Sequence, residues 1–143
     1  MSHRLIRDAV ATRKPLVATA KTTVAEAARL MKEHEVGALM IVDAGRLTGI
    51  FTERDALFRV IAEARNPKAT LVGEVMTTKP QTIAPDKAVG HALLMMYEGG
   101  FRHVPVVERG KPIGMISARD ALGPELEEFQ SEILQREHLR EII

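Results

Sequence analysis

Apolar residues recur at helical spacing in two segments of this chain. In each segment they stand at i, i+3, i+4 and i+7, which places them on one face of a helix. The residues are Val24, Ala27, Ala28 and Met31 in the first segment, and Val89, Ala92, Leu93 and Met96 in the second. A continuous apolar run follows each helix, at 38–42 and 104–107. Because these runs do not alternate with polar residues, they predict strands that are covered on both faces.

Each apolar run leads into a hairpin and a second helix. Gly45 and Gly110 can supply the positive φ angles of turns at 43–46 and 108–111. The other expected elements are short strands at 16–19 and 81–84, returning strands at 49–51 and 114–116, and helices that begin near Glu53 and Ala118. Each copy is therefore predicted to be β-α-β-β-α, and the fold class to be α/β (α+β).

The two copies form a tandem repeat. Shifted by 65 residues, positions 10–57 align with 75–122 without a gap, and 15 of the 48 pairs are identical. A unit of about 50 residues buries too little surface to fold well alone. We therefore expect repeat one (7–64) and repeat two (72–122) to pack their sheets together with pseudo-two-fold symmetry, joined by a loop at 65–68.

The segment 124–143, after the repeats, is predicted to form a C-terminal amphipathic helix. Pro124 suits the first turn of a helix. Leu126, Phe129 and Ile133 recur at spacings of three and four residues among polar ones. We expect this helix either to pack against its own module or to take part in a dimer contact.

Composition and charge narrow the possible functions. The 143 residues include no cysteine and carry a formal net charge of +1. The lack of cysteine rules out disulfides, thiolate zinc sites and a cysteine nucleophile, and the near-neutral charge does not favour nucleic-acid binding. The N-terminal sequence lacks a signal peptide, and no apolar run approaches the ~20 residues of a membrane span. We therefore expect a cytoplasmic protein with no membrane or nucleic-acid partner.

The sequence contains no recognisable catalytic motif. The five histidines show no metal-ligand spacing. A Gly-x-Ser-x-Gly nucleophile motif and a glycine-rich phosphate loop are also missing from the sequence. We therefore expect no enzyme activity, no bound metal and no required cofactor.

Two short motifs carry a resemblance to a known family. Residues 49–55 and 114–120 both read Gly-x-x-Ser/Thr-x-x-Asp, which resembles the pattern that closes the second strand of CBS (cystathionine-β-synthase) domains. The other segments that look like parts of this family are 35–43, 75–77 and 101–107. Each motif alone occurs in many proteins. Two copies in register, over about 7–122, resemble the small stand-alone bacterial proteins that consist of one CBS pair.

The resemblance implies two ligand clefts between the paired sheets. In the family these clefts commonly hold AMP, ADP, ATP, NAD(H) or S-adenosylmethionine, and the pairs commonly form flat homodimers. The motif Asp typically binds the ribose hydroxyls, the Ser/Thr lies near ribose or phosphate, and the first and middle strands sandwich the adenine. The residues implied in this way are Thr52, Asp55, Ser117 and Asp120 from the motifs, Val17, Ala18, Thr82 and Ile83 from the first strands, and His103, Val104 and Pro105 from the second middle strand.

The chemistry of the motif residues is compatible with this implication, but one alternative stays open. Thr52 and Ser117 directly precede expected helices, whose unpaired N–H groups favour an anion. Arg54 and Arg119 could reach a phosphate. The alternative is that Ser/Thr-x-x-Asp forms a capping box, in which the Asp serves only the start of its own helix.

The two copies are not equivalent beside these motifs. Repeat two has Arg102 and His103 where repeat one has Gly37 and Ala38. Because these side chains could add charge near a phosphate, we expect the motif of repeat two to form the better nucleotide site. For His103, a partly exposed strand histidine without a ligand is an equal alternative.

The expected function is that of a regulatory module that binds an adenosine-containing ligand and acts as an energy or metabolite sensor without catalysis. We expect a homodimer, and the module would signal to an effector protein that the sequence does not identify. The alternative function is a ligand-free dimeric scaffold that binds a partner protein.

Overall fold

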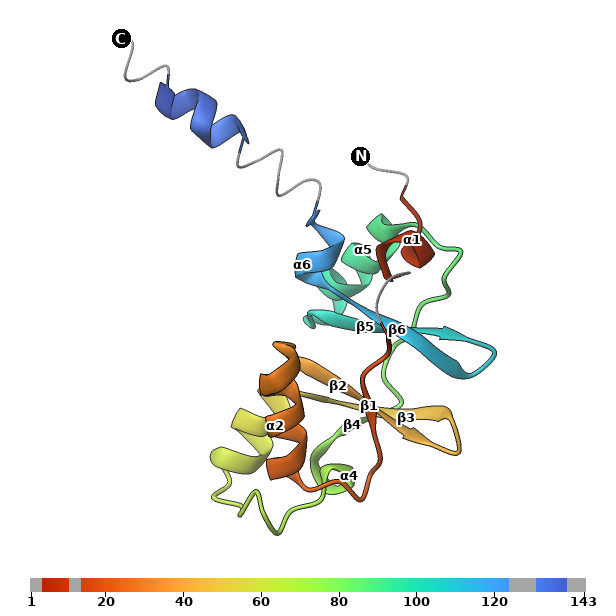
Figure 1. Cartoon of the computed structure of the whole chain (residues 1–143), viewed down its shortest axis with the longest axis vertical. Helices are drawn as coiled ribbons and strands as arrows, with labels where there is room; N and C mark the ends of the chain where they lie inside the picture. Colours follow the sequence, from red (N-terminus) through yellow and green to blue (C-terminus); the bar gives the residue numbers. More distant parts are fainter. Residues whose placement is uncertain (1–3, 11–13, 124–130, 139–143) are drawn as a thin grey trace.

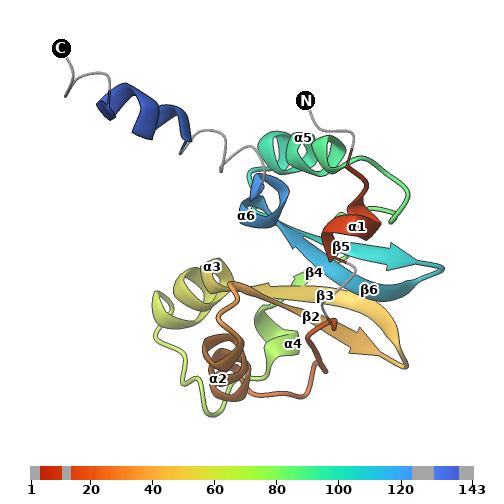
Figure 2. The same ribbon diagram turned by 45° about the horizontal axis from the view of Figure 1, so that its top comes forward.

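The computed structural model describes residues 4–10, 14–123 and 131–138. Two α/β halves lie one above the other with their sheets face to face, and helices cover the outer side of each sheet (Figures 1 and 2). The first half holds repeat one and the second half holds repeat two. The mixed α and β fold with two packed repeats, predicted from the sequence, is confirmed.

Each half contains the expected order of strands and helices. The elements of the first half are β1 (Val17–Ala18), α2 (Val24–His34), β2 (Ala38–Asp43), β3 (Arg46–Thr52), α3 (Glu53–Asp55) and the π-helix η1 (Ala56–Ile61). Those of the second half are α5 (Val89–Gly99), β5 (His103–Glu108), β6 (Lys111–Ser117) and α6 (Ala118–Ala121). The segments at the start of the two repeats add α1 (Ile6–Val10), α4 (Val72–Val75) and β4 (Thr77–Thr78).

The two sheets share an antiparallel central hairpin, formed by β2 and β3 in the first sheet and by β5 and β6 in the second. In the first sheet the strand order is β1-β2-β3-β4, with β1 parallel to β2 and the other pairs antiparallel. In the second sheet β5 pairs with β6, and Ile83 forms a parallel bridge to Val106. The equivalent parallel pair in the first sheet is Ala18 with Ile41. The strand expected at 81–84 is therefore present as a single bridge.

Both hairpin turns have the geometry that the sequence predicts. The φ angles are +50° at Ala44 and +78° at Gly45 in the first turn, and +55° at Arg109 and +81° at Gly110 in the second. Positive φ at both central residues is the type I′ turn, whose twist matches that of the strands it joins.

The middle strands are buried on both faces. Leu39 and Ile41 of β2 contact the helices of the first half in one apolar cluster. Met40 lies between them and points to the opposite face of the sheet, where it is fully buried. Pro105 holds the same position in β5 and is also fully buried. Because β3 and β6 are in contact, these inner faces pack against each other, as expected.

Each half is completed by the helix at the start of the other repeat. Helix α1 lies in the second half, where Ile6 and Val10 join the core of α5, β5 and β6. Helix α4 lies in the first half, where Val72 and Val75 join its core (Figure 1). The N–H groups of Ile6 and Val72 donate to the loops before α5 and α2, both at 2.8 Å. The unit that packs therefore differs from the unit that repeats in the sequence, and the boundaries at 7–64 and 72–122 stay predictions.

A C-terminal helix is also present. Residues 131–138 are helical, and all eight are exposed. Ile133 has an exposed fraction of 39% and Leu134 of 65%, so this part of the helix has no buried face. Leu126 and Phe129 lie outside the described residues.

Replacing Ile6 by alanine should destabilise the protein although Ile6 stands outside repeat two in the sequence. Ile6 is fully buried in the second core, and a buried Ile→Ala change costs about 2–5 kcal/mol. Urea unfolding would measure this loss, with the exposed neighbour change Arg7→Ala as the control. A loss below ~1 kcal/mol for Ile6→Ala would show that α1 does not belong to this core.

Candidate functional site

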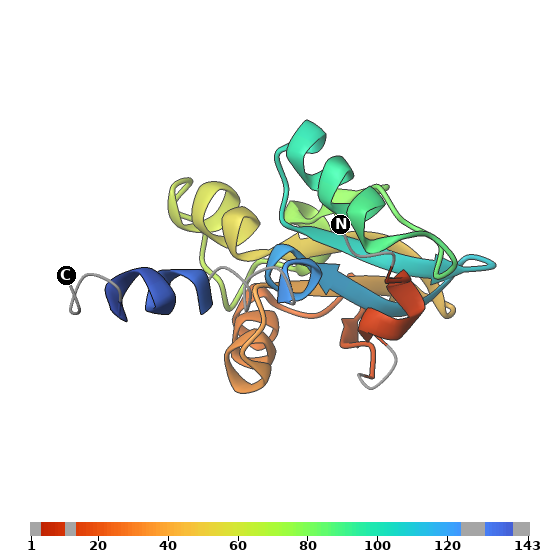
Figure 3. The ribbon, with the colours of Figure 1, turned by 90° about the horizontal axis from the view of Figure 1, so that it is seen from above.

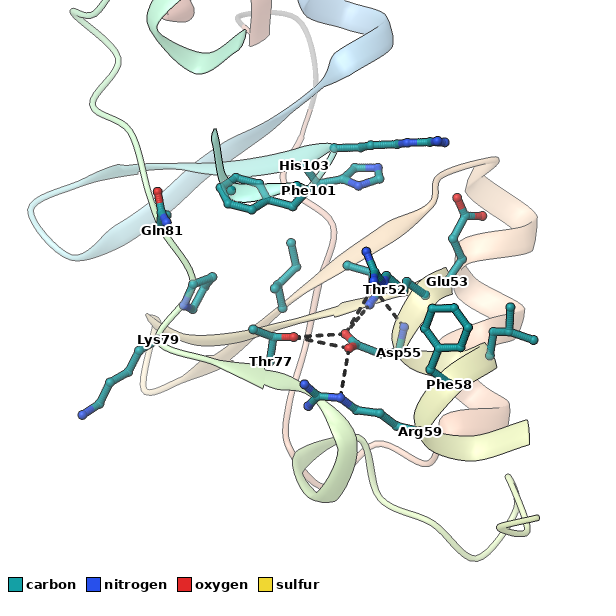
Figure 4. A pocket seen from close by; sticks show the side chains of 17 residues that line it. Thr52, Glu53, Asp55, Phe58, Arg59, Thr77, Lys79, Gln81, Phe101 and His103 are labelled. Carbon is teal, nitrogen blue, oxygen red and sulfur yellow. Dashed lines mark hydrogen bonds and ion pairs between the residues drawn. The ribbon is translucent and has the colours of Figure 1, made fainter. Parts of the chain in front are cut away.

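A cleft of about 1140 Å³ opens between the two halves. Four parts of the chain form it (Figure 4). They are the Thr52 corner (residues 49–55, where β3 turns into α3), the π-helix η1, the strand β4 with the residues that follow it, and the loop that leads into β5. The lining residues are Ile50, Thr52, Glu53, Arg54, Asp55, Leu57, Phe58, Arg59, Thr77, Lys79, Pro80, Gln81, Gly99, Gly100, Phe101, Arg102 and His103. The cleft therefore depends on both repeats.

Thr52 and Asp55 form a capping box on one side of the cleft. The Thr52 hydroxyl oxygen accepts from the Asp55 N–H at 3.2 Å, and Asp55 Oδ2 accepts from the Thr52 N–H at 3.0 Å. The Asp55 residue is only 6% exposed. The capping alternative is therefore realised in the structure, and any ligand would meet a carboxylate that already has partners.

Asp55 also ties the corner to the segment between the repeats. Its Oδ1 accepts from the Thr77 hydroxyl of β4 at 3.3 Å and lies 3.5 Å from Arg59 Nε. Arg59 Nη1 in turn donates to the carbonyls of Val75 and Met76, at 3.3 and 3.0 Å. One carboxylate thus links the start of α3, the π-helix and the end of α4.

The opposite side of the cleft carries Phe101 and His103 (Figure 4). Gly37 makes room here, because a Cβ at this residue would lie 3.0 Å from Glu53 Oε1 and 3.3 Å from His103 Cε1. Glu53 of the first half and His103 of the second half therefore meet at Gly37. Burial lowers the pKa of His103 below its usual 6.5, and Arg102 lowers it further. The carboxylates of Glu53 and Asp120 raise this pKa, but by less than burial and Arg102 together lower it.

The Ser117 corner (residues 114–120) has the same local geometry. Asp120 Oδ2 accepts from the Ser117 hydroxyl at 2.8 Å and from its N–H at 3.3 Å, and the Ser117 hydroxyl oxygen accepts from the Asp120 N–H at 3.1 Å. Arg4 Nη2 donates to the carbonyls of Asp120 and Ala121, at 3.1 and 3.3 Å. The segment that precedes repeat one thus holds the corner of repeat two.

The structure brings together only part of the site expected from the sequence. Of the thirteen expected residues, those that line the described cleft are Thr52, Arg54, Asp55 and His103. Those buried among core or strand residues are Ile83, Val104 and Pro105. Those that lie elsewhere are Val17 and Ala18 on β1, the exposed Thr82, and Ser117, Arg119 and Asp120 at the other corner.

The expectation that repeat two forms the better nucleotide site stays a prediction. It rested on Arg102 and His103 adding charge beside the motif of their own repeat. Both side chains line the cleft at the Thr52 corner. Both residues also stay beside the motif of their own repeat, since His103 is the strand partner of Ser117 and the N–H of Ala118 donates to the carbonyl of Arg102.

Several residues that line the cleft were not among the site residues expected from the sequence. Thr77 stands in the segment 75–77 that resembles the family, and Lys79 belongs to a dipeptide that the two repeats share. Phe101 likewise stands in the segment 101–107 that resembles the family. These were the available signals. Phe58 had no signal, since its place in the cleft depends on how the halves pack.

The comparison with family profiles decides the identity of the fold. The CBS domain profile matches residues 6–62 and again 72–124. The chain belongs to the CBS domain family. It is a tandem CBS pair, and such pairs are regulatory, ligand-binding modules.

Similar proteins agree with this membership. CBS domain-containing protein CBSX3, mitochondrial, from Arabidopsis thaliana is 37% identical over 120 residues, which are 80% of this chain and 58% of that protein. The CBS pair of protein MJ0100, solved with 5′-methylthioadenosine and S-adenosyl-L-methionine, has a TM-score of 0.80 and 26% identity, covering 89% of this chain and 99% of that one. A CBS domain protein from Pyrobaculum aerophilum, solved with AMP, shares the fold at a TM-score of 0.75 and 23% identity, covering 82% and 89%.

Within the described ranges, none of the helices of this CBS pair has the length and apolar character needed to cross a membrane. The cytoplasmic location stays a prediction, since the Arabidopsis relative is named as mitochondrial.

The stability of the CBS pair should fall on mild acidification because of His103. The lowered pKa of His103 means that the folded state favours neutral imidazole. This contribution is fully present above the usual pKa of 6.5 and is lost as the pH falls through the folded-state value. Urea unfolding at pH 7.5 and pH 5.5 should show a larger decrease for the wild type than for His103→Gln. Equal decreases in both proteins would contradict the prediction.

Proposed function

We propose that this CBS pair binds an adenosine-containing ligand in the cleft at the Thr52 corner and acts as a non-catalytic energy or metabolite sensor. The observation that carries the proposal is the cleft itself, which joins a buried carboxylate, Asp55, to residues of both repeats. The small-molecule complexes of MJ0100 and the Pyrobaculum protein support an adenosine ligand in this family.

Ribose recognition would proceed by exchange of hydrogen-bond donors at Asp55. The Thr77 hydroxyl and the Arg59 guanidinium lie at Oδ1. A ribose hydroxyl that replaces the Thr77 hydroxyl substitutes one O–H donor for another, so the buried carboxylate keeps its partners. Phe101, on the other side of the cleft, offers an apolar ring face on which a base can stack.

Regulation would follow from the two-sided construction of the cleft. A ligand shifts a conformational equilibrium only by its differential affinity for the two states. A ligand that contacts both Asp55 and the loop before β5 binds only the arrangement in which the halves face each other as they do here. Such a ligand would stabilise this arrangement, and an effector protein could recognise it.

A thermal-shift series tests the ligand proposal. A ligand at 100 times its Kd should stabilise the folded chain by about 2.7 kcal/mol, and we expect Asp55→Ala to lose most of the increase in Tm that AMP, ATP, NAD(H) or S-adenosylmethionine produces. Because Asp55 also caps α3, the variant itself should be destabilised by ~0.5–2 kcal/mol. The compared quantity is therefore the increase in Tm that the ligand produces in each protein over its own ligand-free Tm. Asp43→Ala, at the exposed first hairpin, should keep the full shift. No shift with any adenosine compound would refute the proposal.

We further propose a homodimer formed through η1 and α5. Both helices lie on the same side of the molecule (Figure 3). The large apolar side chains exposed on them are Leu57, Phe58, Ile61, Leu94 and Tyr97. Exposed apolar patches of this kind are typical of protein contacts. The same observation favours the second candidate function, a ligand-free scaffold, which would retain dimerisation and partner binding in an Asp55→Ala/Asp120→Ala variant.

Light scattering on a gel-filtration column tests the dimer. Ile61 is 69% exposed and Tyr97 is 87% exposed, so Ile61→Glu/Tyr97→Glu should give a folded monomer, because burying two carboxylates without partners opposes association. Lys32→Glu changes the position in α2 that corresponds to Tyr97 and should leave the dimer intact. A dimer that persists in the double variant would place the contact elsewhere.

A further inference from the structure

The charges in the cleft at the Thr52 corner are unevenly distributed. Four lining side chains are cationic and two are anionic. The cationic ones are Arg54, Arg59, Lys79 and Arg102, and the anionic ones are Glu53 and Asp55. The cleft as a whole therefore has a cationic excess.

The cationic side chains differ in their contacts with other side chains. Arg59 is paired with Asp55 at 3.5 Å, which neutralises both. Arg54 lies over the Phe58 ring, 5.3 Å from its centroid, a contact that leaves its N–H groups able to donate at the edge of the guanidinium. Neither Lys79 nor Arg102 forms an ion pair with any residue in the described part of the chain. The cationic groups left for a ligand are therefore those of Arg54, Lys79 and Arg102.

Arg54 and Arg102 both line the cleft although they come from different repeats. Glu53 and His103 meet at Gly37. Arg54 follows Glu53 in the chain, and Arg102 precedes His103. The carboxylate of Glu53 offsets one of their two charges, so these three lining residues together keep a cationic excess. Lys79 stands at the edge of the cleft away from Glu53, beyond Thr77 (Figure 4).

The arginine pair has no full counterpart when the two repeats are compared position by position. The N–H of Ala118 donates to the carbonyl of Arg102 at 2.9 Å, as the N–H of Glu53 donates to the carbonyl of Gly37 at 3.0 Å. Gly37 therefore holds in the first half the place of Arg102 in the second. The 65-residue repeat likewise matches Arg119 to Arg54. Repeat one thus has a glycine where repeat two has Arg102, so only repeat two contributes an arginine from this position.

We infer that the cleft at the Thr52 corner selects adenosine ligands with a phosphate chain over S-adenosylmethionine, with Arg54 and Arg102 binding the phosphates; this rests on the proposed function. Arginine presents a planar set of N–H donors that matches phosphate oxygens. S-adenosylmethionine carries a sulfonium and a net positive charge, which a cationic cleft repels. The wide cleft leaves room for the chain beyond a ribose held at Asp55.

Isothermal titration calorimetry of the full chain with adenosine, AMP, ATP and S-adenosylmethionine tests the inference. The wild type should bind ATP at least about tenfold more tightly than adenosine or S-adenosylmethionine, since a charge-assisted hydrogen bond contributes enough for such a factor. Arg54→Gln/Arg102→Gln should remove about tenfold of the ATP affinity and change that for adenosine by less than about twofold. The ATP preference should also shrink as salt is raised, because exposed charges are screened.

Matched variants separate this effect from a general loss of charge. Lys32→Gln/Lys68→Gln removes the same charge from exposed positions on α2 and on the loop between the repeats, and it should leave ATP affinity unchanged. The inference is overturned if S-adenosylmethionine binds as tightly as ATP, if the arginine variant loses ATP and adenosine equally, or if Lys79→Gln lowers ATP affinity more than the arginine variant does. Adenosine binding without a phosphate preference would overturn this inference alone. Binding of no adenosine compound would overturn the proposed function as well.

Discussion

The exchange of the helices at the start of the two repeats is the constraint on which the rest of the structure depends. Ile6 and Val10 complete the core of the second half, while Val72 and Val75 complete the core of the first. A small α/β unit gains little stability from its own core, so each half relies on a helix that belongs in sequence to the other repeat. Separating the halves would expose both cores, and this holds the walls of the cleft in place.

Asp55 has several structural roles, and the proposed ligand recognition rests on the same side chain. It caps α3, receives the Thr77 hydroxyl and pairs with Arg59. A buried carboxylate needs such partners, because an uncompensated buried charge is costly. The same need makes it a suitable acceptor for ligand hydroxyls. The capping and ligand interpretations of the motif are therefore compatible.

The two repeats keep one backbone plan while their side chains diverge. Corresponding backbone hydrogen bonds have nearly the same length. The N–H of Glu53 donates to the carbonyl of Gly37 at 3.0 Å, and the N–H of Ala118 donates to the carbonyl of Arg102 at 2.9 Å. At these positions the first half contributes a glycine and a carboxylate, and the second half an arginine and a methyl group. Because the sheets face each other, the side chains of one repeat act on the corner of the other.

The sequence by itself determined the duplication, the order of elements in each repeat and the hairpin turns at Gly45 and Gly110, and it offered capping boxes at the two corners as an alternative. These features depend on spacing within a few residues, where apolar periodicity and φ preference act directly. Only the tertiary structure decided that α1 packs in the second half and α4 in the first. It also decided that Thr77 contacts Asp55 and that Arg102 and His103 line the cleft at the Thr52 corner. Those contacts join residues far apart in the chain, and they follow from the simultaneous burial of two cores, which no local pattern encodes.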